Sequence, residues 1–411
     1  MSTFRLSDVT SAQKRTLVAA SLGWALDAFD VMLYTMVIAR VMESLDISKS
    51  TAGLLNTFTL LASGIGGVLF GFIADRIGRT KALMLSILTY SVCSLGSGLS
   101  TTIPMLGAFR FVLGLGMGGE WNTGATLVAE TWPTELRSKA MAIVQSSWAW
   151  GYAAAVLVAG FVLKATNQNW RAVFFVGILP ALVTLWMWKS VPESEMWKRQ
   201  QQTPKAQQAG FFSIFAPELR WKTICLLLLN LFGLFAWWGL FSWMPPYLIM
   251  PIAKGGRGLG LGSTTTLLVI LNLAGMFPGY ISFGWVAERL GRKRAFAGYL
   301  LCAALLVPVY ALAREPWLIM VAGTLVAFFG TGFFSGSGLI GSEIFPTEVR
   351  ARGLGFTYNG ARALSSIAPY TIGKIGDKHG LSWAFFICAI AFFLAMVMAT
   401  LLPETKGKEL T

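Results

Sequence analysis

The sequence contains little charge, one histidine and few cysteines. Only 13% of its 411 residues are charged and 55% are hydrophobic, whereas a soluble surface needs about a quarter of its residues charged. A water-soluble fold is therefore excluded. The single histidine and four cysteines, each cysteine inside an apolar run, argue against a metal site or a disulfide framework. Without a Walker-type loop or a nucleophile–histidine pair, we expect no cofactor and no enzymatic activity.

Long apolar runs make up most of the sequence, and its mean hydropathy is +0.63. Twelve segments reach the roughly 20 residues that a helix needs to cross a bilayer. They are 16–39, 52–74, 82–100, 103–129, 140–164, 171–190, 223–250, 263–287, 295–312, 316–341, 353–373 and 382–402. The sequence therefore predicts an all-α integral membrane protein with twelve transmembrane helices in two six-helix halves.

Positive charge is distributed unequally between the two sides of the membrane. The net charge is +14, and of 33 Lys and Arg residues 22 fall in the termini and alternate loops, nine in the opposite loops and two inside spans. Since basic residues concentrate in cytoplasmic loops, we expect both termini in the cytoplasm and the chain in the inner (plasma) membrane, surrounded by lipid. Topology explains the basic excess, so we expect no nucleic-acid partner.

The chain divides at its longest connection. We predict an N-terminal bundle over 1–190, a cytoplasmic linker over 191–222 and a C-terminal bundle over 223–411. Each bundle closes on a Pro-Glu-Ser or Pro-Glu-Thr sequence, Pro192 to Ser194 and Pro403 to Thr405, which we interpret as helix ends. Because one chain carries both halves, we expect a monomer.

Two motifs recur in the second half at a single offset of 213 residues, which indicates an internal duplication. Gly71-Phe-Ile-Ala-Asp75-Arg76-Ile-Gly78-Arg79 recurs as Gly284-Trp-Val-Ala-Glu288-Arg289-Leu-Gly291-Arg292, and Glu130-Thr-Trp-Pro133-Thr134-Glu135-Leu-Arg137 recurs as Glu343-Ile-Phe-Pro346-Thr347-Glu348-Val-Arg350. We expect Arg79 to pair with Glu130 or Glu135, and Asp75 to cap a helix of the other half. The alternative is that the basic residues serve only as topology signals and the others as caps.

These motifs resemble those of the major facilitator superfamily, whose loop between spans 2 and 3 carries G-x-x-x-D-R-x-G-R. The resemblance covers the whole chain and implies two halves that rock about a site near the bilayer midplane, exposing it to each side in turn. It also implies that the repeated motifs govern this exchange. The gating candidates are Asp75, Arg79, Glu130, Arg137, Glu288, Arg292, Glu343 and Arg350.

Three acids lie inside predicted spans, where a charge is costly and usually functional. Asp27 and Asp30 are three residues apart, so their carboxylates share one helix face near the midplane and should not both ionise readily. We expect this pair to carry a proton; the alternative is that one acid caps a helix break or pairs permanently with Arg110. Glu120 in span 4 is either a further proton site or a partner of a nearby backbone or Trp N–H.

Two arginines also lie inside spans and predict a site for an anion. Arg110 is placed at a depth comparable with Asp30, so protonation of the acid would free the guanidinium to hold an anion. Arg362 shares a face of span 11 with Asn359. The candidate substrate contacts are Arg110, Arg362, Asn359, Tyr358, Tyr34 and Gln145. Trp148, Trp237 and Trp238 lie deep enough to shape a cavity.

Span 11, with its Phe345-Pro-Thr-Glu-Val-Arg350 approach, is similar to the sialate:proton symporter family, which includes sialic acid carriers and lactate–pyruvate permeases. The Asp27-Ala-Phe-Asp30 and Gly118-Gly-Glu-Trp121 sequences point the same way. The resemblance implies proton-coupled import of a small organic anion, such as lactate, pyruvate or a sialic-acid-like sugar acid. Alternatives are a proton-coupled carrier of aromatic acids or other metabolites, a proton-driven exporter and a membrane sensor.

Overall fold

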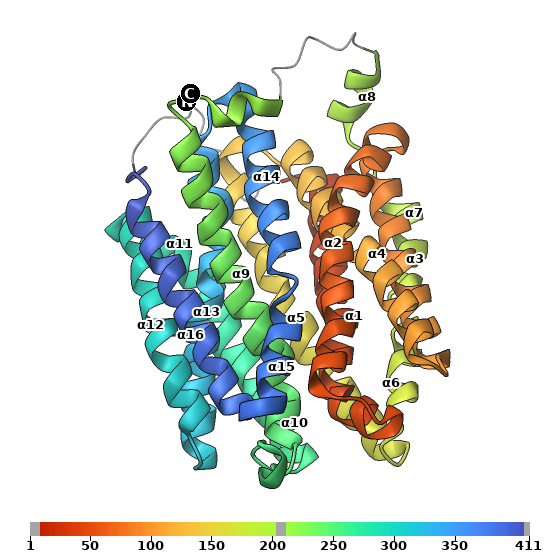
Figure 1. Ribbon diagram of the computed structural model, residues 1–411. Coiled ribbons are helices and arrows are strands. Elements are labelled where there is room, and N and C mark those ends of the chain that lie inside the picture. The colour runs from red at the N-terminus through yellow and green to blue at the C-terminus, as the bar shows by residue number, and fades with distance from the viewer. Residues whose placement is uncertain (1–8, 203–210, 407–411) are drawn as a thin grey trace. The chain divides into compact units, whose positions relative to one another are not determined.

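The computed structural model describes residues 9–202 and 211–406, and within these ranges the regular structure is entirely helical (Figure 1). The helices up to the predicted linker are α1 (Ser11–Leu45), α2 (Lys49–Ile77), α3 (Arg79–Leu99), α4 (Ile103–Thr131), α5 (Thr134–Ala165), α6 (Trp170–Val176), α7 (Ala181–Ser190) and α8 (Glu195–Gln202). After it come α9 (Arg220–Ile249), α10 (Leu261–Ile270), α11 (Phe277–Leu290), α12 (Arg292–Leu312), α13 (Pro316–Ile344), α14 (Thr347–Ser365), α15 (Ala368–His379) and α16 (Leu381–Leu401). Part of the predicted linker, 203–210, lies outside the described residues.

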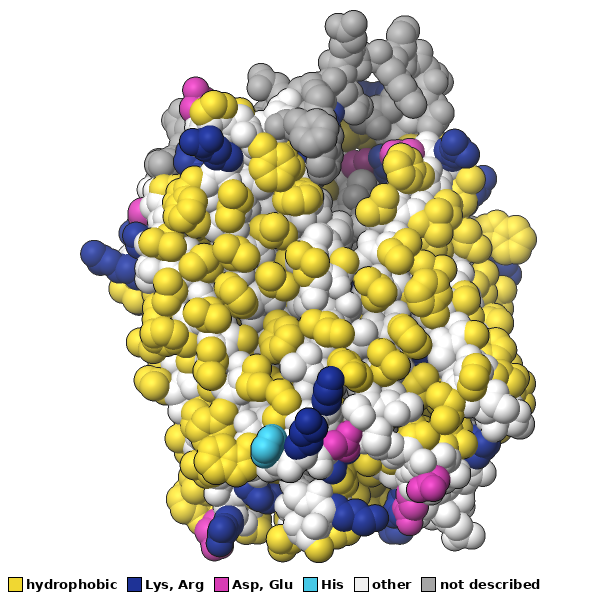
Figure 2. Space-filling model, in the orientation of Figure 1, with side chains coloured by type: hydrophobic (Ala, Val, Ile, Leu, Met, Phe, Trp, Pro, Cys, Tyr) yellow, Lys and Arg dark blue, Asp and Glu magenta, His cyan; other side chains and the backbone are white. Residues whose placement is uncertain are grey.

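Ten helical segments in the described ranges are long and apolar enough to cross a membrane. The two other predicted spans are helical as well: α4 carries the buried Arg110 and Glu120, and α14 with α15 forms an interrupted span. Figure 2 shows apolar side chains over most of the visible face, with charged groups gathered toward its ends. Phe161, which is 74% exposed, is one of many large apolar side chains that suit contact with lipid.

Three predicted spans are interrupted or irregular helices. The span at 171–190 turns at 177–180 between α6 and α7, where Pro180 follows Gly177. The span at 353–373 breaks between Ser365 and Ala368, just before Pro369. The span at 263–287 contains a π-helical turn at Leu271–Met276, before Pro278. Proline lacks an N–H and clashes with the preceding turn, so it accounts for all three positions.

The described residues form two compact units. The first comprises 9–37 and 58–202, and the second 38–57 and 211–406. The end of α1 and the start of α2 therefore group with the second unit, whereas the sequence assigned them to the first bundle. The predicted limits of the two bundles stay a prediction.

The start of α2 is held inside the second unit by Asp377 of α15. The Asp377 carboxylate accepts the backbone N–H groups of Lys49 at 3.0 Å and Ser50 at 2.9 Å, and it lies 3.9 Å from the Lys49 ammonium. Farther along α2, the buried Asn56 amide donates to the Ser242 hydroxyl at 2.9 Å. An acid at a helix N-terminus satisfies unpaired N–H groups and the helix dipole.

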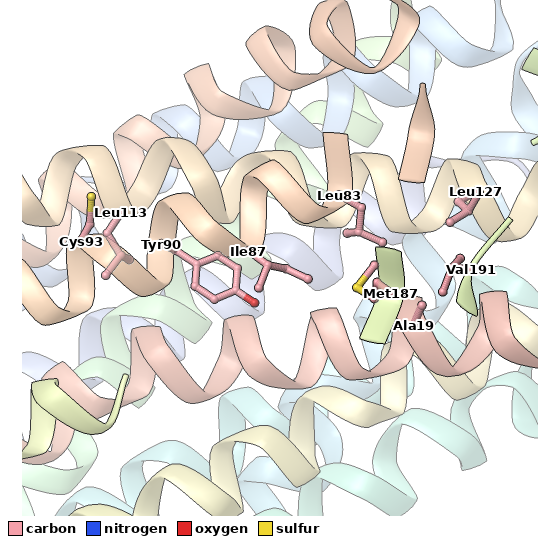
Figure 3. Close-up of a cluster of buried hydrophobic side chains, with 9 residues drawn as sticks. All are labelled: Ala19, Leu83, Ile87, Tyr90, Cys93, Leu113, Leu127, Met187 and Val191. Atoms are coloured by element: carbon pink, nitrogen blue, oxygen red, sulfur yellow. The ribbon is translucent and has the colours of Figure 1, made fainter. Parts of the chain in front are cut away.

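In the first unit, α3 and α4 pack along their length. Figure 3 shows part of the resulting core, in which Leu83, Ile87 and Tyr90 of α3 meet Leu113 and Leu127 of α4. Gly114 and Gly118 of α4 face α2 so closely that an added Cβ would lie 2.1 Å from the Thr59 carbonyl and 1.9 Å from that of Ser63. The glycine-rich run thus permits close helix packing.

In each repeated loop motif, the glycine before the final arginine leaves space for a glutamate side chain. Gly78 and Gly291 adopt positive φ values of 106° and 96°, directly before α3 and α12. A Cβ on these glycines would lie 2.2 Å from a carboxylate oxygen of Glu193 and 2.5 Å from one of Glu404. These glutamates, interpreted above only as helix ends, act as caps: Glu193 accepts the N–H groups of Arg79 and Thr80, and Glu404 those of Arg292 and Lys293.

Glu404 should give the protein a measurable pH dependence of stability. Burial raises the pKa of its carboxyl, but four backbone N–H groups, including those of Arg292 and Lys293, outweigh burial and hold that pKa below its usual value. The stabilisation is therefore complete above the unfolded-state pKa of about 4.3 and is lost as the pH falls through the lower folded-state pKa. We expect Glu404→Gln to cost about 1 kcal/mol or less at pH 7, because the site is exposed.

The measurement is the thermal unfolding midpoint in detergent at pH 7 and in acid. The matched control is Glu218→Gln, since that glutamate is exposed and outside both caps. The Glu404 variant should unfold earlier than the wild type at pH 7 and converge with it in acid. Equal midpoints at pH 7, or a gap that widens in acid, would contradict the cap.

Candidate functional site

Buried polar side chains from α1 and α4 gather inside the first unit. They are Asp27, Asp30 and Tyr34 of α1, and Arg110 and Glu120 of α4, each at most 1% exposed. Ionisable groups inside a membrane are costly, so they pair with one another or face a cavity, and they usually have a function. The structure thus brings together five of the residues that the sequence singled out.

Arg110 lies over the ring of Tyr34. The guanidinium carbon is 4.4 Å from the ring centroid, and Phe174 of α6 stacks against the same tyrosine at 6.5 Å. Asp30 lies one turn before Tyr34 on α1, and its charge interacts with that of Arg110. The cation therefore lies over a ring face and within the electrostatic field of an acid, so its attraction for an anion depends on the charge of Asp30.

Asp30 is enclosed by α3 and by the break between α6 and α7. The Ser94 hydroxyl lies beside its carboxylate and donates to the Phe174 carbonyl at 3.4 Å. An added Cβ on Gly177 would lie 1.9 Å from the Ser94 oxygen and 2.4 Å from Asp30 Oδ1. The unpredicted break in this span thus occurs where the chain must make room for the acid.

Glu120 extends from α4 to the backbone of α1. A Cβ on Gly23 would lie 2.4 Å from Glu120 Oε1, and Gly23 precedes Asp27 by about one turn. Beside it, Trp24 packs against Trp121 and Trp148 with ring centroids 4.5 and 4.7 Å apart. Three indoles therefore cover this end of the acid cluster, and Trp148 is as deep as the sequence indicated.

The remaining substrate candidates lie elsewhere. Gln145 is buried on α5, which is tied to α1 by the hydrogen bond from the Ser147 hydroxyl to the Ser21 carbonyl at 2.8 Å. Arg362, Asn359 and Tyr358 belong to α14 in the second unit. Arg362 is 3% exposed and interacts electrostatically with Tyr358, while Asn359 is partly buried. Arg362 and Asn359 lie three residues apart in one continuous helix and so share a face, while their role in binding stays a prediction.

Sequence reasoning missed a buried amide beside this group. Asn230 of α9 accepts from the Ser337 hydroxyl of α13 at 2.6 Å and donates to the Thr357 carbonyl of α14 at 3.3 Å. It thus fixes α14 next to Tyr358. The sequence does contain a signal for it, because Asn230 is the only amide in the apolar run from Cys225 to Phe232.

An aromatic wall lies in the same unit. Trp237 packs against Phe241 at 4.8 Å, Trp238 at 4.9 Å and Phe334 of α13 at 5.6 Å between ring centroids. All of these α9 rings are buried, which agrees with the depth predicted for the two tryptophans. Flat, polarisable surfaces of this kind suit contact with planar groups.

The repeated motifs form ion pairs inside each unit. Arg79 contacts Glu130 at 3.1 Å and Asp75 at 2.5 Å, so one of the two predicted partners of Arg79 is observed. Arg292 contacts Glu343 at 2.9 Å. The side chain of Glu135 lies outside those described, and the cap expected from Asp75 stays a prediction.

The two copies differ in detail. Glu288, the counterpart of Asp75, is exposed, and Arg292 instead donates to the Ala287 carbonyl at 3.2 Å. Arg350 donates to the Phe345 carbonyl at 3.1 Å, whereas Arg137 is partly buried at the start of α5. Each motif therefore joins helices of one unit; a gating role stays a prediction.

Comparison with known proteins extends over almost the whole chain. The model of the Major Facilitator Superfamily matches residues 20–277 and 247–411. The sialic acid transporter NanX of Escherichia coli is 33% identical, over 97% of this chain and 96% of its own. The cis,cis-muconate transport protein of Acinetobacter baylyi is 29% identical, over 96% and 95%. A crystal structure of a D-xylose–proton symporter, 18% identical, aligns with a TM-score of 0.80 over 97% of this chain and 100% of the other, which confirms the predicted fold.

Gly177→Ala tests how closely the break between α6 and α7 packs against Asp30. The added methyl group must displace the Asp30 carboxylate and the Ser94 hydroxyl, so we expect a loss of about 1–3 kcal/mol of stability. Thermal unfolding in detergent measures it. The matched control is Gly298→Ala, where an added Cβ meets nothing within 4 Å.

A second variant tests whether the clash with Ser94 causes the loss of stability in Gly177→Ala. Ser94→Gly removes the nearest atom to the added methyl group, the Ser94 Oγ at 1.9 Å, and the Ser94 Cβ at 2.6 Å, so the double variant with Gly177→Ala should be more stable than the sum of the single losses implies. Additive losses, or equal midpoints for Gly177→Ala and Gly298→Ala, would contradict the close packing of Gly177 against Ser94 and Asp30.

Proposed function

Since the chain belongs to the Major Facilitator Superfamily, we propose that this multi-pass membrane protein imports a small organic anion together with a proton, by alternating access. The observation that carries the proposal is Arg110, fully buried over Tyr34 and in electrostatic contact with Asp30. The family consists of transporters, in agreement with the expectation that the chain is no enzyme.

The coupling follows from charge. When Asp30 is ionised, its negative charge offsets the positive charge of Arg110, so an incoming anion gains little binding free energy from the arginine. Protonation of Asp30 removes that compensation, so a carboxylate then binds more tightly, and an empty, deprotonated site is again neutral enough to reorient. Asp27 shares the helix face and competes for the same proton. Arg362, with Asn359 and Tyr358, is the second candidate for holding the carboxylate.

The class of acid has two candidates. A monocarboxylate such as lactate, pyruvate or a sialic-acid-like sugar acid is supported by the relative that carries sialic acid. A planar unsaturated or aromatic acid is supported by the wall of Trp237, Phe241 and Phe334 and by the relative that carries cis,cis-muconate. Two buried arginines disfavour a cationic drug, and hence the exporter of cations.

Placement and gating complete the proposal. The bias of basic residues supports both termini in the cytoplasm and the inner membrane as the location, with a monomer as the working unit. The repeated motifs then lie on the cytoplasmic side. Their ion pairs, Arg79 with Glu130 and Arg292 with Glu343, would keep each half rigid while the halves rock.

Uptake into proteoliposomes tests the proposal. The probes are labelled lactate, pyruvate, sialic acid, nicotinate and cis,cis-muconate, with an inward proton gradient imposed and then collapsed by an ionophore; protein-free liposomes correct for diffusion of neutral acids. We expect at least one acid to accumulate only while the gradient lasts. If none accumulates beyond the protein-free level, the proposal is wrong.

Asp30→Asn separates coupling from binding. The variant cannot ionise, so accumulation driven by the gradient should be lost while exchange of labelled for unlabelled acid continues. Asp46→Asn is the matched control, because Asp46 is exposed at the end of α1 with a φ of 49°, which asparagine adopts readily. Unimpaired accumulation by Asp30→Asn would remove this acid from the mechanism.

A further inference from the structure

Tyr90 of α3 is a fully buried side chain that neither the sequence nor the proposed site has used. It is 0% exposed, and among the described residues its hydroxyl has no hydrogen-bond partner. Figure 3 shows the ring within the apolar cluster, with the hydroxyl on the side of α1. A buried hydroxyl without a partner destabilises a protein, whereas phenylalanine would fill the same space at no such cost.

Three acids of the first unit interact electrostatically with Tyr90. They are Asp27 and Asp30 of α1 and Glu120 of α4. The side chains nearest the ring in Figure 3, Ile87 and Cys93 of α3 and Leu113 of α4, carry no charge. Tyr90 therefore lies where the acids of two helices converge.

The helix register places Tyr90 between these acids. On α3, Ser94 lies beside Asp30 and Tyr90 precedes Ser94 by one turn, which brings it level with the earlier part of α1. On α4, Gly116 packs against Tyr90, because an added Cβ there would lie 3.0 Å from the Tyr90 nitrogen. Glu120 follows Gly116 by one turn and extends to Gly23 of α1.

We propose that the Tyr90 hydroxyl relays protons between the Asp27–Asp30 pair and Glu120. The inference rests on the proposed proton coupling. A hydroxyl accepts and donates at one oxygen. In the inward step the O–H bond of a protonated aspartate breaks and its proton bonds to the Tyr90 oxygen, while the original Tyr90 proton passes to Glu120. The aspartate becomes a carboxylate, Glu120 becomes a neutral acid, and Tyr90 is a phenol before and after.

The relay gives the proton its own path through the first unit. Glu120 lies ten residues beyond Arg110 on α4, about 15 Å along the helix. A proton that leaves Asp30 by this path moves away from Arg110 without crossing the anion. Glu120 thereby acquires the role of second proton site, which was one of its two predicted roles.

Tyr90→Phe tests the relay, with Tyr152→Phe as matched control. Tyr152 is also fully buried in the first unit, but its hydroxyl faces Thr35 rather than the acids. The first readout needs no substrate: infrared spectroscopy of the purified protein after a pH jump follows the carboxyl C=O band that disappears in Glu120→Gln. We expect protonation of Glu120 to slow about tenfold or more in Tyr90→Phe and to keep its rate in Tyr152→Phe.

The second readout compares two modes of transport of whichever probe acid the wild type accumulates. Gradient-driven uptake by Tyr90→Phe should fall about tenfold, whereas exchange, which needs no net proton movement, should change less than about twofold. An unchanged Glu120 rate, or equal losses of uptake and exchange, would overturn the relay. If the wild type accumulates no acid, the proposed function fails, and the infrared rates alone then decide the relay.

Discussion

The cost of burying charge in a bilayer is the constraint on which this structure depends. Hydrocarbon cannot solvate an ion, so every charge inside the membrane needs a partner in the protein. The chain accordingly keeps most of its ionisable groups in loops and places Asp27, Asp30, Arg110 and Glu120 inside the first unit. There the Arg110 guanidinium meets the ring of Tyr34 and the field of Asp30. A site whose balance changes with one proton can couple that proton to an anion.

The same constraint shapes the loops. Each copy of the repeated motif has a positive-φ glycine before its last residue, and this glycine lets a glutamate cap the next helix, Glu193 at α3 and Glu404 at α12. The arginine that follows each glycine pairs with a second glutamate of the same unit. Each unit thus contains its own set of ion pairs and capped helices at the repeated motifs.

Much of this was predictable from the sequence. Hydropathy and the offset of 213 residues give the spans and the duplication, and the spacing of Asp27 and Asp30 gives their shared face. Contacts between distant segments were not predictable. The capping by Glu193, the insertion of Glu120 against Gly23, and the break at Gly177 beside Asp30 depend on helix packing. Tyr90 and Asn230 were not predicted either, because a neutral polar group in an apolar helix gives a weaker sequence signal than a charged one.

Direct detection of the proton is the sharpest test of whether a proton enters together with the acid. A pH-sensitive dye trapped inside proteoliposomes, at equal internal and external pH and with the voltage clamped by potassium and valinomycin, reports protons that enter when an acid is added outside. The account predicts internal acidification that follows uptake of the labelled acid in the wild type and is absent in Asp30→Asn, beyond any signal from protein-free liposomes. Labelled acid that enters without acidification would contradict it.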